Sequence, residues 1–98
     1  MISIEVDGGD YALQTVLQGI MQALQGREKI IVRIDENGIT TSDTTIKDEI
    51  MERYREIMDI LTEPDMAVEA AVTAVAKERG MDVIRIRAPA KAVWILYK

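Results

Sequence analysis

The sequence has 98 residues and a formal net charge of −5, with 48% hydrophobic and 30% charged residues, and it contains neither cysteine nor histidine. This length suits one domain with one hydrophobic core, and the composition is that of a folded chain. The missing residue types exclude disulfides, thiolate catalysis, histidine general bases and the usual zinc sites. Because nucleic-acid binding depends on neutralising phosphates, an acidic chain also disfavours nucleic acid as a partner.

The N-terminal residues carry neither a basic segment nor an apolar core, so they do not resemble a signal peptide. No apolar run approaches the roughly 20 residues that a membrane-spanning helix requires. We therefore expect one domain over residues 1–98 that resides in the cytoplasm and does not enter a membrane.

The first half of the chain predicts a strand at 2–7, a helix at 11–25, a strand at 29–35 and a short hairpin strand at 39–41. The first strand alternates between apolar and polar residues, and the helix shows apolar residues at helical spacing. Asp10 is the expected N-cap of that helix and Gly26 its expected stop. Whether residues 39–41 pair as a strand is left open by the sequence.

The second half predicts helices at 46–61 and 66–79, followed by strands at 81–87 and 91–97. Ser42 and Thr45 are the expected start of the first of these helices, with Asp48 completing a capping box. The run Thr62-Glu63-Pro64 is expected to separate the two helices, because proline suits a first helical position. Ala88-Pro89-Ala90 is expected to join the last two strands as a hairpin.

The order β-α-β-(β)-α-α-β-β predicts an α/β two-layer sandwich. We expect a mixed sheet of four to five strands with the helices on one face and a parallel first β-α-β unit. In this arrangement Ile30, Val32 and Ile34 share the helix-facing side with Ile84 and Ile86. The last strand is apolar on both sides, which is typical of a strand in the middle of a sheet or under a covered surface.

The other face of the sheet would then be open, and it mixes apolar groups with arginines. The candidate residues for a ligand or partner there are Arg33, Arg85, Arg87 and Trp94. Three interpretations remain: a solvated face in which arginine stems cover the apolar groups, a dimer surface, or a site for an anionic ligand or single-stranded RNA.

The first predicted helix has no charged residue between Tyr11 and Gln25, although the chain is rich in charge. Its polar side chains form a stripe of Gln14, Gln18, Gln22 and Gln25. Gly19 lies in mid-helix, where glycine costs up to about 1 kcal/mol relative to alanine. This pattern fits either a helix packed between the sheet and another helix or a subunit interface.

Asp7, Asp10 and Asp35 are the candidate metal ligands. If the first two strands are adjacent and parallel, Asp7 and Asp35 lie at neighbouring carboxyl ends, where α/β sheets place ligands. Such oxygens could hold Mg²⁺ for phosphoryl or phosphodiester chemistry. The alternative is that Asp10 caps a helix and the others form turns. No pairing of a nucleophile with a base is recognisable, so we assign no catalytic residue and no other cofactor.

The leading hypothesis is a non-enzymatic binding or assembly module, self-associating as a homodimer or binding another protein through the open sheet face or the uncharged first helix. One alternative is an artificial chain made to realise a fold, with no natural function. Others are Mg²⁺-dependent chemistry at the strand-end carboxylates and anionic-ligand or RNA binding on the arginine-bearing face.

Overall fold

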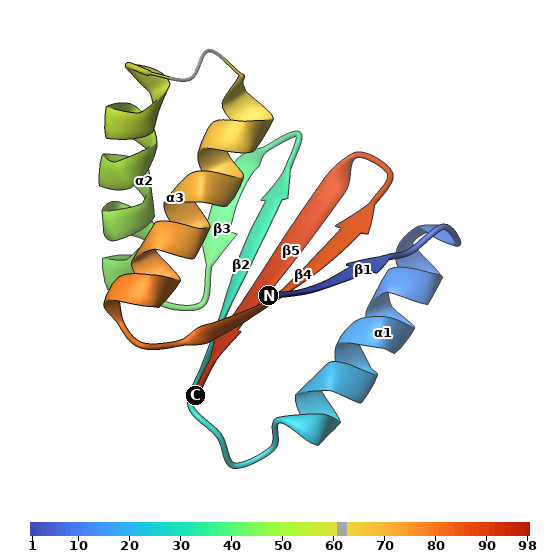
Figure 1. Ribbon diagram of the computed structural model, residues 1–98. Helices are drawn as coiled ribbons and strands as arrows, with labels where there is room; N and C mark the ends of the chain where they lie inside the picture. The colour runs from blue at the N-terminus through green and yellow to red at the C-terminus, as the bar shows by residue number, and fades with distance from the viewer. Residues whose placement is uncertain (61–62) are drawn as a thin grey trace.

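The computed structural model describes residues 1–60 and 63–98. Within them the chain forms five strands and three helices (Figure 1): β1 (Ile2–Glu5), α1 (Gly9–Ala23), β2 (Lys29–Asp35), β3 (Gly38–Thr41), α2 (Thr44–Met58), α3 (Pro64–Glu78), β4 (Asp82–Ala88) and β5 (Lys91–Tyr97). The predicted element order is confirmed, and β3 shows that the residues after the Glu36-Asn37 turn pair as a strand. Within residues 1–60 and 63–98, no helix is long and apolar enough to cross a membrane.

The strands form one mixed sheet in the order β1-β4-β5-β2-β3. β1 pairs with β4 in parallel, whereas the β4–β5, β5–β2 and β2–β3 pairs are antiparallel. β1 and β2 therefore run in the same direction, but β4 and β5 lie between them. β5 is the central strand, as its apolar residues on both sides predicted. The fold class, an α/β sandwich on a mixed five-stranded sheet, is confirmed.

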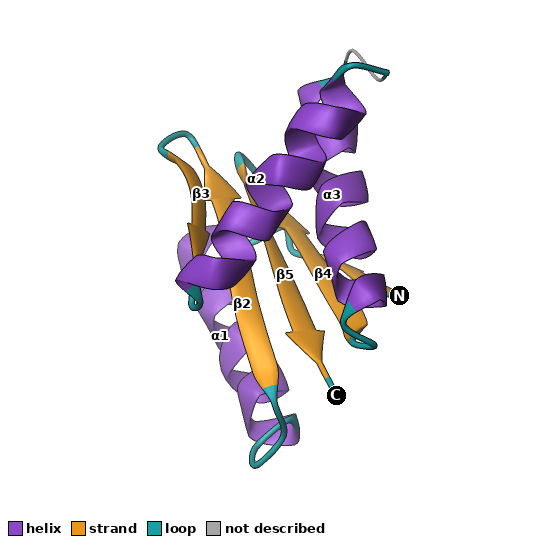
Figure 2. Cartoon of the chain, turned by 90° about the vertical axis from the view of Figure 1, so that its left-hand side faces the viewer, coloured by secondary structure: helices purple, strands orange, loops and turns teal. Residues whose placement is uncertain are grey.

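The placement of the helices differs from the prediction that all of them share one face. α1 lies on one side of the sheet, and α2 and α3 lie on the other (Figure 2). The reason is the strand register, in which Ile95 of β5 is opposite both Ile31 and Ile84. Ile30 and Ile84 consequently point to opposite faces, because a shift of one residue reverses the direction of every side chain.

Each face of the sheet has its own hydrophobic core. The core beneath α1 contains Val6, Leu13, Leu17, Leu24, Ile84, Ile86, Val93 and Ile95. The core beneath α2 and α3 includes Ile30, Val32, Ile46, Ile50, Ala71, Val72, Val75, Val83, Trp94 and Leu96. Consecutive residues of β5 thus enter different cores, so its apolar residues from Val93 to Leu96 are buried on both sides of the sheet.

The helix starts differ from the expected caps. α1 begins after Gly8 with no side-chain cap, and Asp10 lies in its first turn. α2 is capped by Asp43, whose carboxylate accepts hydrogen bonds from the backbone N–H groups of Thr45 and Ile46 at 2.8 and 3.3 Å. Pro64 occupies the first position of α3, as predicted. The expectations for Leu61 as the last residue of the helix predicted at 46–61 and for Thr62 in the break fall outside the described residues.

Candidate functional site

The four candidate residues of the predicted open face do not share one face. Arg33 is opposite Val93, which belongs to the core beneath α1, whereas Arg85 is opposite Trp94, which belongs to the core beneath α2 and α3. Arg87 follows Arg85 by two residues and points to the same side. Helices cover both faces, and Trp94 is only 4% exposed. The structure therefore separates Arg33 from the other three.

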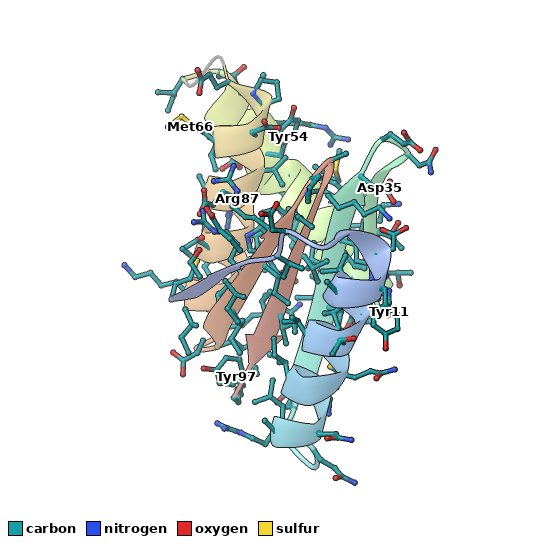
Figure 3. The ribbon with its side chains drawn as sticks, turned by 90° about the vertical axis from the view of Figure 1, so that its right-hand side faces the viewer. Tyr11, Asp35, Tyr54, Met66, Arg87 and Tyr97 are labelled. Carbon is teal, nitrogen blue, oxygen red and sulfur yellow. The ribbon has the colours of Figure 1, made fainter. Side chains whose placement is uncertain are left out.

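Arg85, Arg87 and Trp94 line a cavity of about 530 Å³ between the first turns of α3 and the β4–β5 hairpin. The end of β2 closes another side, where Asp35 contributes a fourth residue that the sequence singled out. Figure 3 shows Arg87 on β4 and Met66 on α3, both of which line this cavity. The volume is within the range of about 300–1,000 Å³ that is typical of small-molecule sites.

Arg85 is held in place by two partners. Its Nη1 donates to the carboxylate of Glu69 on α3, and its Nη2 donates to Ser3 Oγ on β1 at 2.9 Å. Both members of the Arg85–Glu69 pair are partly buried. Because each charge neutralises the other at close range, the pair fixes α3 against the sheet at the wall of the cavity.

Trp94 is the single tryptophan of the chain, and its indole has an unsatisfied polar group. The Nε1–H group is buried and has no hydrogen-bond partner among the described residues. Leaving a buried donor without an acceptor costs about 1–3 kcal/mol. Trp94 contributes its indole ring to the wall of the cavity, whereas this N–H group is enclosed by the chain.

The three candidate metal ligands are not brought together. Asp10 pairs with Lys91 at 2.6 Å between Oδ1 and Nζ, and Asp35 accepts the backbone N–H of Asn37 at 2.8 Å. Across residues 1–60 and 63–98, no three acidic side chains are close enough to hold a metal ion. The cause is the strand order, because the β4–β5 hairpin lies between the ends of β1 and β2 and brings Lys91 to that edge.

The ion pair of Lys91 predicts a pH dependence of stability. The hydrogen bond with Asp10, assisted by the charges of Asp35 and Glu36, raises the pKa of Lys91 above its ordinary value. The contribution of this pair to folding is therefore complete below the ordinary lysine pKa of about 10.4 and is lost as the pH rises through the folded-state value. We expect the free energies of unfolding of the wild type and Lys91→Met to converge at alkaline pH. Urea unfolding at several pH values checks this, and a constant difference would contradict it.

The second candidate surface is the outer side of α1. A groove of about 370 Å³ runs between α1 and β2, with Gln14, Gln18 and Gln22 on one side and Ile31 and Arg33 on the other. The predicted glutamine stripe thus faces this groove and the adjoining solvent. Tyr11 is 86% exposed at the start of the same helix (Figure 3). The interpretation of α1 as a helix packed between the sheet and another helix is not supported, because α2 and α3 cover the opposite face.

Gly19 lies on this exposed side and is not required by packing within the chain. A Cβ built at Gly19 meets no side chain and no backbone outside its own helix within 4 Å among the described residues. Gly19→Ala is therefore expected to stabilise the monomer by about 0.5–1 kcal/mol, since alanine is the better helix former. Gly26→Ala is the control and is expected to destabilise, because Gly26 has a φ of +82°. Urea unfolding at low protein concentration checks both, and a destabilised Gly19→Ala would contradict the assignment.

Comparison with protein-family models, with curated protein sequences and with solved structures finds no match. The two surfaces therefore rest on the geometry of this chain. The sequence named Arg85, Arg87, Trp94 and Asp35, but it missed Asp65 and Lys91 as cavity residues. No sequence signal could have found them, because the cavity forms only when α3 packs over the hairpin.

Proposed function

We propose that this protein is a non-enzymatic assembly module that forms a homodimer through the outer side of α1. The observation that carries the proposal is an exposed helix surface without charge, centred on a glycine that the fold of the chain does not use. Of the two surfaces considered from the sequence, the sheet face is covered by helices, and α1 is the surface left for a partner. A cytoplasmic setting stays a prediction from the composition.

Charge selects α1 over the other two helices as the contact between copies. The exposed side of α2 carries Lys47, Asp48, Glu52 and Arg55, and the exposed side of α3 carries Asp65 and Lys77. Packing two copies of an acidic chain through such surfaces would bury charges, which is costly unless each is paired. The core of a protein interface is typically depleted of charged residues. The glutamine-bearing side of α1 meets this requirement.

The residues of α1 also suit a surface that packs against itself. A two-fold interface brings the same residues of both copies together, so each side chain must be compatible with its own equivalent. Glutamine amides both donate and accept hydrogen bonds, so Gln14, Gln18 and Gln22 satisfy this condition. Gly19, which lies beside Gln18, permits close approach of two helices at that point. We therefore place the two-fold axis near Gln18 and Gly19, with the two α1 helices antiparallel.

Gln18→Glu tests this proposal with almost no change of shape. In the dimer it would bring two carboxylates together near the axis, and like charges at an interface cost several kcal/mol. We expect a concentration-dependent dimer for the wild type by light scattering behind a sizing column. For Gln18→Glu we expect a dissociation constant at least about tenfold higher, restored toward the wild-type value when acid protonates the new carboxylate.

Lys47→Gln on α2 is the matched control, because it makes the same change in net charge on an exposed surface away from α1. It is expected to leave the dimer unchanged. A chain that is monomeric at every concentration would contradict the proposal. A dimer that Gln18→Glu leaves intact would place the interface elsewhere.

A further inference from the structure

We infer that the cavity between α3 and the β4–β5 hairpin binds a small zwitterion, a molecule with a carboxylate and an ammonium group on a short apolar body. This inference concerns the side of the sheet opposite α1 and does not depend on the proposed dimer. It rests on the hydrogen-bonding and charge properties of the residues that line the cavity.

The guanidinium of Arg87 calls for an acceptor on the ligand. Arg87 is exposed, and among the described residues no acid pairs with its guanidinium. A carboxylate offers two oxygens with several acceptor positions and forms its strongest hydrogen bonds with guanidinium groups. The carboxylate of the ligand is therefore assigned to Arg87.

The remaining charges exclude a simple anion. Arg85 is neutralised by Glu69, and Lys91 is paired with Asp10. The other charged lining residues besides Arg87 are Asp35, Glu36 and Asp65. Three carboxylates against one guanidinium would repel a phosphate or sulfate but attract an ammonium group. The ligand therefore carries a positive group in addition to its carboxylate.

The body of the ligand is apolar. Ile34, Met66, Val68 and Ala92 line the cavity beside the indole of Trp94. Methionine adapts to irregular shapes and contacts aromatic rings favourably, and aromatic rings pair with one another. An α-amino acid with a large apolar side chain combines these features with the two required charges, and its size suits the volume of about 530 Å³.

Three probes that share one apolar body separate the parts of the inference. Phenylalanine carries both charges, phenethylamine only the ammonium group, and 3-phenylpropionate only the carboxylate. Because Trp94 is the single tryptophan, its fluorescence reports directly on the cavity. We expect phenylalanine to change this fluorescence saturably with a Kd of about 1 mM or tighter, and each single-charge probe to bind at least about tenfold more weakly.

Two variants test the assigned partners. Arg87→Gln and Asp65→Asn are each expected to weaken phenylalanine binding by about tenfold, because each removes one charged partner. The matched controls are Arg55→Gln and Asp48→Asn on the exposed side of α2, which are expected to bind as the wild type does. Circular dichroism confirms that each variant is folded. In the unmodified chain, phenylalanine is expected to shift the backbone amide signals of Ala90 and Ala92.

Three outcomes would overturn the inference. The first is a wild-type chain whose Trp94 fluorescence and amide signals respond to none of the probes. The second is a single-charge probe that binds as tightly as phenylalanine, which would reduce the site to one for an anion or for a cation. The third is unchanged binding in both folded cavity variants. None of these outcomes bears on the α1 dimer, whose test is the solution mass.

Discussion

Ile95→Ala and Leu96→Ala are each expected to lower the free energy of unfolding by about 2–5 kcal/mol, the usual range for truncating a fully buried aliphatic side chain. These neighbours on β5 enter different cores, Ile95 beneath α1 and Leu96 beneath α2 and α3. Both are 0% exposed. Because a domain is stable by only about 5–15 kcal/mol, either change removes a large part of its stability. Urea unfolding measures both effects.

The comparison between the two variants is more informative than either value. A sheet with one open face would make one of the two substitutions nearly silent, since adjacent residues of a strand point to opposite faces. Ile2→Ala on the edge strand β1 is the control, because Ile2 is 54% exposed and its truncation should cost no more than about 1 kcal/mol. An effect of that small size at either Ile95 or Leu96 would contradict helices on both faces.

Ala71→Leu is expected to destabilise the protein by about 1–3 kcal/mol through overpacking. Ala71 is fully buried in the core that α2 and α3 share with the sheet. The side chain of leucine has no space there unless α3 shifts relative to the other elements of this core. Leucine is also a good helix former, so a loss of stability must come from packing and not from the helix itself.

Ala74→Leu on the same helix is the matched control. Ala74 is only half-buried, so the larger side chain can extend toward solvent. We expect its effect to be within about 0.5 kcal/mol. Equal effects at Ala71 and Ala74 in urea unfolding would show that α3 is not closely packed on the sheet.

The secondary structure was predictable because its signals are local. The bounds of β2 agree with the prediction residue for residue, and Pro64 begins α3 as proposed. The caps were harder, because Ser42, Asp43 and Thr45 are all good N-cap residues and their order alone does not select Asp43. The choice depends on where β3 ends, which is a tertiary property.

The placement of the helices was not predictable for a different reason. One side of β2 carries Ile30, Val32 and Ile34, and the other carries Ile31 among charged residues; neither pattern shows which helix that side faces. Ile30 and Ile31 are both suited to a core, and the register with Ile95 decides between them. The prediction aligned Ile30 with Ile84, but they lie on opposite faces. Because the predicted alignment of these strands was wrong by one residue, their apolar residues were assigned to a single face. The other face was then predicted to be open, although helices cover both faces.

The candidate site was predictable only in part. Arginines and a tryptophan in a β-rich segment identified three residues of the cavity. Asp35 was identified for its chemistry, but it was grouped with the wrong partners, because adjacency of β1 and β2 could not be tested from sequence. Lys91 is the first residue of the last strand, as predicted, but its ion pair with Asp10, far away in the sequence, was not foreseen.

The measurement that tests the central claim most directly is a concentration series of backbone amide NMR spectra. If the molecule assembles through the uncharged side of α1, raising the concentration should shift the amide signals of Gln14 to Gln22 and of Ile31 and Arg33 beside the groove. The signals of the exposed sides of α2 and α3 should stay unchanged. Shifts confined to α2 and α3, or no shift at any concentration, would contradict the assignment of α1 as the assembly surface.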